Sequence, residues 1–295
     1  MSKMLGVIPN IVTPMNVEGR PDLDGVASLS KQLIKEGVGG LWVLGSAGED
    51  IHISLSDRMA VASAAIEAVG DDAPIVVGLS NATYYEIMEF CNNVDVSRAE
   101  GVHYLPYDVK MDDVILIDYI LKLANDLPCP LWLYHNPKRG KPISFDVVSR
   151  VCLHPNIIGI KVGGYSLSNL TSMMMLRSES FEVSGAGGGQ MYQMLSLGAR
   201  LHMTSDASCY PSIFISLLDL FRAGKLEEAR KLQFDIIKFT KGIPRTGNGE
   251  NSAEEKYIIN RRYGIIKPYV NSSYRMLRQD EKDLIDKQLM SFNLL

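Results

Sequence analysis

A lysine inside an apolar run is the residue of this sequence with the clearest chemical potential. Lys161 stands in IIGIKVG (157–163), a run typical of a buried strand. Burial disfavours the ammonium and lowers the pKa of a lysine. A neutral amine can attack a ketone and form a Schiff base, whose iminium withdraws electrons from the adjacent carbon. The alternative is a structural lysine that is paired or reaches solvent, although lysines are rarely buried.

A tyrosine on the preceding strand could assist that chemistry. Tyr134 lies in PLWLYHN (130–136), next along the chain to the run with Lys161. A phenol near the amine could carry protons while a carbinolamine forms and collapses. On its own, a tyrosine in a strand usually serves packing. The combination with Lys161 on a neighbouring strand favours the chemical interpretation.

Three other segments could contact an anionic substrate. The turn Gly45-Ser46-Ala47-Gly48 offers a hydroxyl and backbone N–H groups to a carboxylate, although a plain tight turn uses the same residues. Arg139, in KRGK, could pair bidentately with a second carboxylate or be a solvated loop arginine. GAGGGQ (185–190), which begins at Gly185, departs from the dinucleotide-binding G-x-G-x-x-G and indicates a close-approach loop.

Other classes of site are not predicted. The five histidines form no H-x-x-x-H pair, so we expect no metal, and no P-loop or G-x-S-x-G is present. The cysteines are far apart and lack a C-x-x-C pair, which predicts reduced thiols in a cytoplasmic protein. They are Cys91, Cys129, Cys152 and Cys209.

Short apolar runs recur along the chain and predict strands. They are nearly continuous in hydrophobicity, as expected for parallel strands buried on both faces. The eight runs are 6–14, 40–45, 74–80, 101–106, 130–136, 157–163, 181–187 and 201–207.

Amphipathic segments of helical length alternate with these runs. They cover 22–37, 54–70, 83–98, 111–126, 144–153, 166–178, 188–198 and 211–223. Eight strand–helix units predict an α/β fold, a closed (β/α)₈ TIM barrel over residues 1–224. A doubly wound open sheet is the competing topology, but it often carries a glycine fingerprint after its first strand, which this chain lacks. The reactive side chains would then gather at the carboxyl ends of the barrel strands.

The remaining residues predict a helical C-terminal extension over 225–295, packed on the barrel. Helices are expected at 225–241, 250–262 and 279–291, with Pro244, Gly247 and Gly249 marking a break. The whole chain has 295 residues, of which 46% are hydrophobic, and a formal charge of −4. This composition is that of a globular protein and disfavours nucleic acid as a partner. No apolar run approaches the ~20 residues that span a membrane, and the N-terminus lacks a signal-peptide core.

These motifs together resemble the dihydrodipicolinate synthase/N-acetylneuraminate lyase superfamily. The resemblance rests on the G-[ST]-x-G-E turn after the second strand, on Tyr134-x-x-Pro, and on G-I-K around Lys161, and it covers essentially the whole chain. It implies a lyase of the class I aldolase type, acting on pyruvate or a related 2-oxo acid and an aldehyde. It also implies no cofactor beyond the covalent Schiff base, and a homotetramer.

Carried over by position, the resemblance makes Lys161 the Schiff-base lysine, Tyr134 the proton-transferring phenol and Ser46 the first hydroxyl of the turn. Ala47 stands where the family usually has a threonine that helps to hold the pyruvate carboxylate. Arg139 matches an arginine that binds the distal carboxylate in dihydrodipicolinate synthases. Tyr107 and Gly185 complete the candidate substrate-binding residues.

The chain departs from the family pattern in two further places. Asp108 follows Tyr107 where a second tyrosine is usual, and Val162 replaces the usual acidic residue after G-I-K. Three functions therefore stay open. The first is condensation or cleavage by a lyase of a 2-oxo acid. The second is a dehydratase or aldolase of 2-keto-3-deoxy sugar acids, and the third is a catalytically impaired member that binds a small metabolite.

Overall fold

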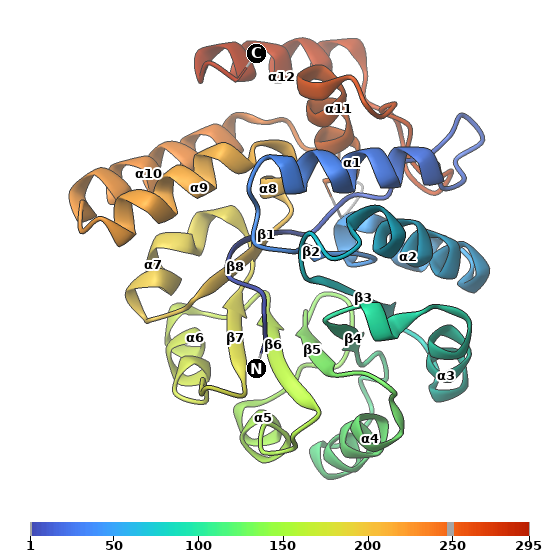
Figure 1. Cartoon of the computed structure of the whole chain (residues 1–295). Coiled ribbons are helices and arrows are strands. Elements are labelled where there is room, and N and C mark those ends of the chain that lie inside the picture. Colours follow the sequence, from blue (N-terminus) through green and yellow to red (C-terminus); the bar gives the residue numbers. More distant parts are fainter. Residues whose placement is uncertain (1, 247–250, 295) are drawn as a thin grey trace.

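Eight parallel strands form a ring at the centre of the molecule, and helices surround it (Figure 1). The computed structural model describes residues 2–246 and 251–294. The strands are β1 (Gly6–Pro9), β2 (Leu41–Trp42), β3 (Ile75–Ser80), β4 (Gly101–Leu105), β5 (Leu131–His135), β6 (Ile157–Val162), β7 (Glu182–Gly185) and β8 (Leu201–Thr204).

Helices connect consecutive strands on the outside of the ring. They are α1 (Leu23–Lys35), α2 (Leu55–Val69), α3 (Tyr84–Asn93), α4 (Asp113–Asp126), α5 (Phe145–Val151), α6 (Leu167–Met174) and α7 (Met191–Ser196), and then α8 (Asp206–Cys209) and α9 (Pro211–Arg222) follow the last strand. Helices α1 to α6 each begin after a Ser, Thr or Asp whose side chain accepts a backbone N–H of the first turn. Local capping thus fixes where each strand-to-helix loop ends.

The ring is closed at two places by single β-bridges rather than by full strand pairing. Strands β2 to β7 pair in sequence order, and β1 pairs with β8. Single parallel bridges, Asn10 with Trp42 and Ala186 with Met203, connect the two sheets. Strand β2 is short because Leu44 turns into the left-handed region, at φ 62°, and a turn of 3₁₀ helix begins at Ser46. The predicted TIM barrel is confirmed, although the run 40–45 supplies only two strand residues.

The barrel interior is a core of its own. Trp132 and Tyr134 on β5 point into it, while Leu131 and Leu133 join the outer core under the helices, as the two-residue period of a strand requires. The indole of Trp132 fills the space beside Gly159, where an added Cβ would lie 2.4 Å from the ring. The same alternation brings Trp42 to the inside of β2.

Three helices follow α9: α10 (Leu226–Gly242), α11 (Ser252–Tyr263) and α12 (Gln279–Ser291). Helix α10 packs beside α9, and α11 contacts α8, so these helices cover one side of the barrel (Figure 1). Gly247 and Gly249, expected to break the helices, lie outside the described residues. Two of the predicted elements were longer than the observed ones. The helix expected at 83–98 ends at Asn93, and the run 201–207 leaves its strand after Thr204. Among the described residues, no helix is long and apolar enough to cross a bilayer.

Candidate active site

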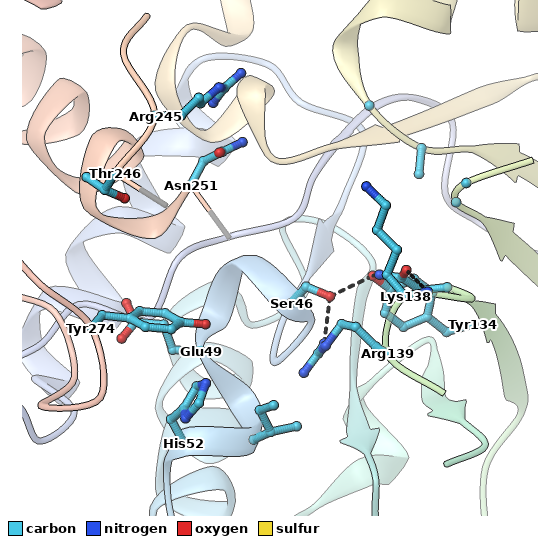
Figure 2. A pocket seen from close by; sticks show the side chains of 16 residues that line it. Ser46, Glu49, His52, Tyr134, Lys138, Arg139, Arg245, Thr246, Asn251 and Tyr274 are labelled. Atoms are coloured by element: carbon cyan, nitrogen blue, oxygen red, sulfur yellow. Dashed lines mark hydrogen bonds between the residues drawn. The ribbon is translucent and has the colours of Figure 1, made fainter. Parts of the chain in front are cut away.

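A cavity of about 970 Å³ opens at the carboxyl ends of the barrel strands. Side chains from the β2 loop, from β5 and its loop, and from the segments before α11 and α12 face it (Figure 2). The described lining residues are Ser46, Glu49, Ile51, His52, Tyr134, Asn136, Lys138, Arg139, Gly163, Gly164, Ala186, Gly187, Arg245, Thr246, Asn251 and Tyr274. Segments that are distant in sequence therefore share one polar space.

Hydrogen bonds link Ser46 to two other residues on the wall of the cavity. The Ser46 hydroxyl lies 2.9 Å from the Tyr134 hydroxyl, and Arg139 Nη1 donates to Ser46 Oγ at 2.6 Å (Figure 2). Asn136 Nδ2 donates to the same phenol oxygen at 3.3 Å. Either hydroxyl of the Ser46–Tyr134 pair can be the donor, and the phenol oxygen also accepts from Asn136. The arrangement therefore suits Tyr134 to proton exchange with a group in the cavity.

Arg139 is itself held by a buried carboxylate. Its Nη2 lies 2.7 Å from Asp50 Oδ1, and the two side chains are 9% and 0% exposed. The guanidinium thus bridges Asp50 and Ser46, and it fixes the rotamer of the serine hydroxyl. A buried pair of this kind is strongly orienting, because moving either partner leaves the other charge unpaired.

Lys161 lies inside the barrel, beside Tyr134. The two residues are opposite one another in the β5–β6 pairing, and the lysine is 2% exposed. Its Nζ lies over the Tyr134 ring, 4.3 Å from the centroid, and over the Trp42 ring, 5.1 Å from the centroid. The amine is therefore held in a water-poor space bounded by aromatic faces.

Histidines near the amine are neutral. Burial lowers the pKa of His103 to about 3 and that of His202 to about 4. The His103 ring stacks on Trp42 with centroids 4.4 Å apart, and its Nε2 hydrogen-bonds the Val43 carbonyl oxygen. These side chains shape the barrel interior without adding positive charge at neutral pH.

A second buried ion pair ties the β2 loop to the C-terminal helices. Glu49 adopts left-handed backbone angles, at φ 54°, and its carboxylate contacts Lys256 Nζ with both side chains 0% exposed. The other carboxylate oxygen accepts the backbone N–H of Asn271 at 2.8 Å, and Ser252 Oγ donates to the Ala47 carbonyl at 3.2 Å. Burial lowers the pKa of Lys256. The loop that carries Ser46 is thus anchored from α11.

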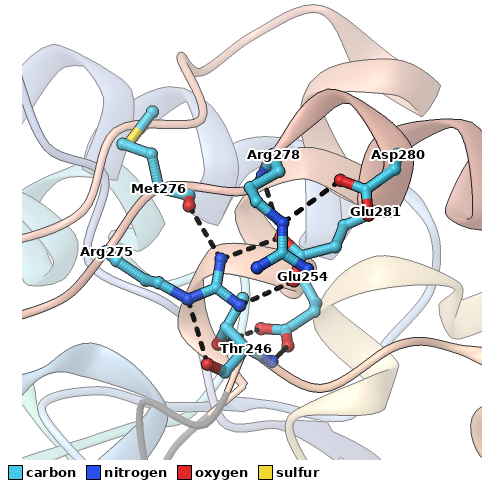
Figure 3. Close-up of polar contacts among 7 residues, drawn as sticks. All are labelled: Thr246, Glu254, Arg275, Met276, Arg278, Asp280 and Glu281. Carbon is cyan, nitrogen blue, oxygen red and sulfur yellow. Dashed lines mark hydrogen bonds and ion pairs between the residues drawn. The ribbon is translucent and has the colours of Figure 1, made fainter.

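A further network holds the opposite wall of the cavity (Figure 3). Arg275 makes two hydrogen bonds to the Glu281 carboxylate, at 2.8 and 2.6 Å, and its Nε donates to the Thr246 carbonyl at 3.1 Å. The Thr246 N–H donates to Glu254 at 2.6 Å. The hydrogen bonds from Arg275 lower the pKa of Glu281 to about 2. Residues Thr246 and Tyr274 therefore reach the cavity from a cross-linked segment.

The structure gathers some of the sequence-predicted residues and separates others. Ser46, Tyr134 and Arg139 line the cavity, and Lys161 adjoins it. Ala47 is buried within the Ser46–Gly48 turn and is not among the described lining residues, and Gly185 ends β7 against Met194.

Tyr107 is 46% exposed and is not among the described lining residues. Asp50 and Asn136 were not predicted as site residues, although both adjoin quoted motifs. Lys256 has no local signal in the sequence, because its partner is 207 residues away.

The chain is similar to known proteins in both sequence and structure. A model of the Dihydrodipicolinate synthetase family matches residues 3–284. A 4-hydroxy-tetrahydrodipicolinate synthase of Methanospirillum hungatei is 30% identical over 78% of this chain and 80% of its own.

Two solved structures superpose on the chain, each with 25% identity and 99% of both chains covered. One is YagE, a prophage protein of the dihydrodipicolinic acid synthase family from Escherichia coli K12 in complex with pyruvate, with a TM-score of 0.91. The other is the dihydrodipicolinate synthase of Bacteroides thetaiotaomicron, with a TM-score of 0.90.

The anchoring pair yields a prediction. Lys256→Met leaves the Glu49 carboxylate buried without its partner and should lower the free energy of unfolding by about 3–5 kcal/mol. Adding Glu49→Gln removes the stranded charge, so the double variant should regain much of that loss. Lys238→Met breaks the exposed pair with Asp235 on α10 and serves as the control, with an expected change of about 1 kcal/mol or less. Denaturant unfolding measures all three. A Lys256→Met chain as stable as the control would contradict the anchoring role.

Proposed function

Because the chain belongs to the dihydrodipicolinate synthetase family, we propose that it is a class I aldolase-type lyase that binds pyruvate or a related 2-oxo acid as a Schiff base on Lys161. The placement of the buried Lys161 opposite Tyr134, which lines the cavity, is the observation that carries the proposal. A buried amine beside a hydrogen-bonded phenol has the two groups that Schiff-base formation needs. The reaction needs no metal or organic cofactor.

The chemistry divides between the two side chains. The Lys161 nitrogen attacks the ketone carbon, a C–N bond forms as the C=O π bond opens, and a proton passes from the nitrogen to the ketone oxygen to give a neutral carbinolamine. Tyr134 gives its proton to the hydroxyl as the C–O bond breaks and water leaves, the nitrogen lone pair forms the iminium, and Tyr134 is left as a phenolate. The phenolate then takes a proton from the methyl carbon, which gives a neutral enamine that can attack an aldehyde. Cleavage is the same sequence in reverse.

Ser46 orients the 2-oxo acid. Its hydroxyl contacts both Tyr134 and Arg139 and lies in the cavity wall, where it can donate to the substrate carboxylate. The backbone N–H of Ala47 is the second proposed donor, because it directly follows Ser46 in the 3₁₀ turn. The methyl group of Ala47 cannot supply the hydrogen bond that a threonine would.

The rim of the cavity is suited to an anionic, polar aldehyde. Arg139 remains the candidate for a distal carboxylate, which would share the guanidinium with Asp50. Lys138 and Arg245 add positive charge to the lining, and Thr246, Asn251 and Tyr274 add hydroxyl and amide groups. The polar C-terminal wall favours, as a second candidate, an aldolase or dehydratase of 2-keto-3-deoxy sugar acids. A catalytically impaired metabolite binder is the remaining alternative, and trapping of the Schiff base separates it from both enzymes.

The four thiols support a reducing, cytoplasmic location. Cys91, Cys129 and Cys209 are buried and Cys152 is half-buried, and all four are free. The buried contacts of Lys256 support treating residues 225–295 as an extension of the 1–224 barrel rather than as a separate domain.

Reduction with borohydride tests the covalent step. Pyruvate and borohydride together should add mass at Lys161, whereas Lys161→Ala and Lys161→Arg should stay unlabelled, because neither retains a nucleophilic amine. Lys122→Ala, which removes an exposed lysine of α4, is the control and should label normally. Peptide mass spectrometry locates the adduct. Labelling of the Lys161→Arg chain at a rate within about tenfold of the unchanged chain would falsify the assignment.

Restoring a hydroxyl at position 47 tests the carboxylate contact. One hydrogen bond to a charged group contributes about 1.5–3 kcal/mol at best, so Ala47→Thr should tighten pyruvate binding by around tenfold. Ala47→Ser is the matched control, since it adds the hydroxyl without the extra methyl group. Calorimetric titration with pyruvate and with larger 2-oxo acids measures both. If neither variant bound pyruvate more tightly, Ala47 would not mark a carboxylate contact. Weaker binding of the larger acids would then indicate that the alanine makes room for them.

We also propose that four copies of the chain associate. Tyr107, Val109, Val114 and Ile115 follow one another around the start of α4 and are 46% to 65% exposed. Such a group of apolar side chains is typical of an interface, and Tyr107 would then act between subunits. Light scattering should give the mass of four chains of 32.7 kDa each. A mass of one chain at micromolar concentration would exclude the tetramer.

A further inference from the structure

We propose that the indole ring of Trp42 stabilises the positively charged iminium on Lys161 through a cation–π contact. The inference rests on the proposed Schiff-base function and adds a residue to it. It assigns Trp42, which the reaction steps above leave unused, an electrostatic part in the covalent step.

The geometry brings two ring faces to one nitrogen. Lys161 Nζ lies 5.1 Å from the Trp42 centroid and 4.3 Å from the Tyr134 centroid, over each ring. A cation within about 6 Å of a ring centroid is attracted by the ring quadrupole, and tryptophan attracts it most. The two rings meet edge to face, with centroids 5.9 Å apart and planes at 79°. They therefore form two adjoining walls around the reacting atom.

The indole is held rigidly in this place. Trp42 is 0% exposed, stacks on His103 with planes 10° apart, and meets Trp132 at 87°. Its carbonyl oxygen accepts the Ile11 N–H at 2.9 Å. Within the described part of the chain, its Nε1 has no hydrogen-bond partner. A buried N–H without a partner costs stability. The part of the Trp42 side chain that contacts the site is therefore the ring face and not the N–H.

A ring face is useful here because of where the charge lies. The neutral amine, the ketone and a proton give the iminium and water, and the positive charge stays until the enamine forms. Val162, the next residue on β6, packs in the outer core. His103, which stacks on the indole, is neutral, so the indole is not stacked on a competing cation.

Fluorination tests the contact without changing the shape of the ring. Each fluorine withdraws electron density from the ring face, so a cation–π contact weakens step by step. The chain has two tryptophans, and Trp132→Phe leaves Trp42 as the only one. This variant is made with tryptophan and with mono-, di- and trifluorotryptophan, and saturated with pyruvate labelled at its carbonyl carbon. Carbon NMR then gives the ratio of iminium to the carbinolamine and enamine.

We expect this ratio to fall progressively, by about tenfold over the series. The matched control is Trp42→Phe, in which Trp132 alone carries the fluorines and the ratio should not change with their number. Trp42→Phe itself, which keeps a ring, should retain more iminium than Trp42→Leu, which has none. A merely structural role would not give a graded response at constant ring shape.

The outcomes separate this inference from the proposed function. Iminium in every protein, at a ratio that does not depend on fluorination, overturns the role of Trp42 and leaves the Schiff-base function intact. An unchanged chain that forms no pyruvate adduct at Lys161 overturns both. A trend that also appears with fluorinated Trp132 assigns the effect to the barrel interior as a whole and overturns the specific contact.

Discussion

The pairing of β5 with β6 is the constraint on which the site depends. Parallel strands fix neighbours by backbone hydrogen bonds, and here they set Tyr134 opposite Lys161. The two-residue period then decides that both side chains face the barrel interior, together with Trp132 on β5. A slip of one residue in this register would send the lysine under the helices and the phenol away from it. The barrel therefore positions the reactive pair through its backbone, before any side-chain contact is made.

The walls of the cavity depend on charge rather than on strand register. The β2 loop leaves regular structure at Leu44, and its course is held by the Asp50–Arg139 and Glu49–Lys256 pairs. Buried pairs cost desolvation energy and are poor sources of net stability, but they are specific in geometry. That specificity suits a loop whose serine must meet the Tyr134 hydroxyl at hydrogen-bond distance. The opposite wall is held by the Arg275–Glu281 ion pair, in which the arginine is 38% exposed and the glutamate is buried.

Much of the fold and part of the candidate site could be predicted from the sequence, for reasons that differ between residues. The eight apolar runs predicted the barrel, because the patterns of buried strands and of helix caps are visible in neighbouring residues of the sequence. Lys161 stood out because a cation within such a run is rare. Trp42 did not, because a tryptophan in a strand is ordinary until its neighbours in space are known.

Lys256 and Asn271 gave no local signal in the sequence, because their role depends on contacts with Glu49, which is distant along the chain. The strand ends were set too far along the chain for the same reason. The chain leaves β2 at Leu44, which has left-handed backbone angles, and it leaves β8 for the helix that begins at Asp206.

The Glu49–Lys256 pair also determines when, during protein synthesis, the site can acquire all of its contacts. The two residues are separated by 207 positions, so a ribosome that adds about 5–20 residues per second needs roughly 10–40 s to pass from one to the other. Throughout that interval the nascent barrel carries an acidic loop whose buried counter-ion does not yet exist. The loop with Ser46 gains this anchor only after α11 has emerged from the ribosome. A chain that ends before Lys256 contains all eight strands and still lacks the anchor.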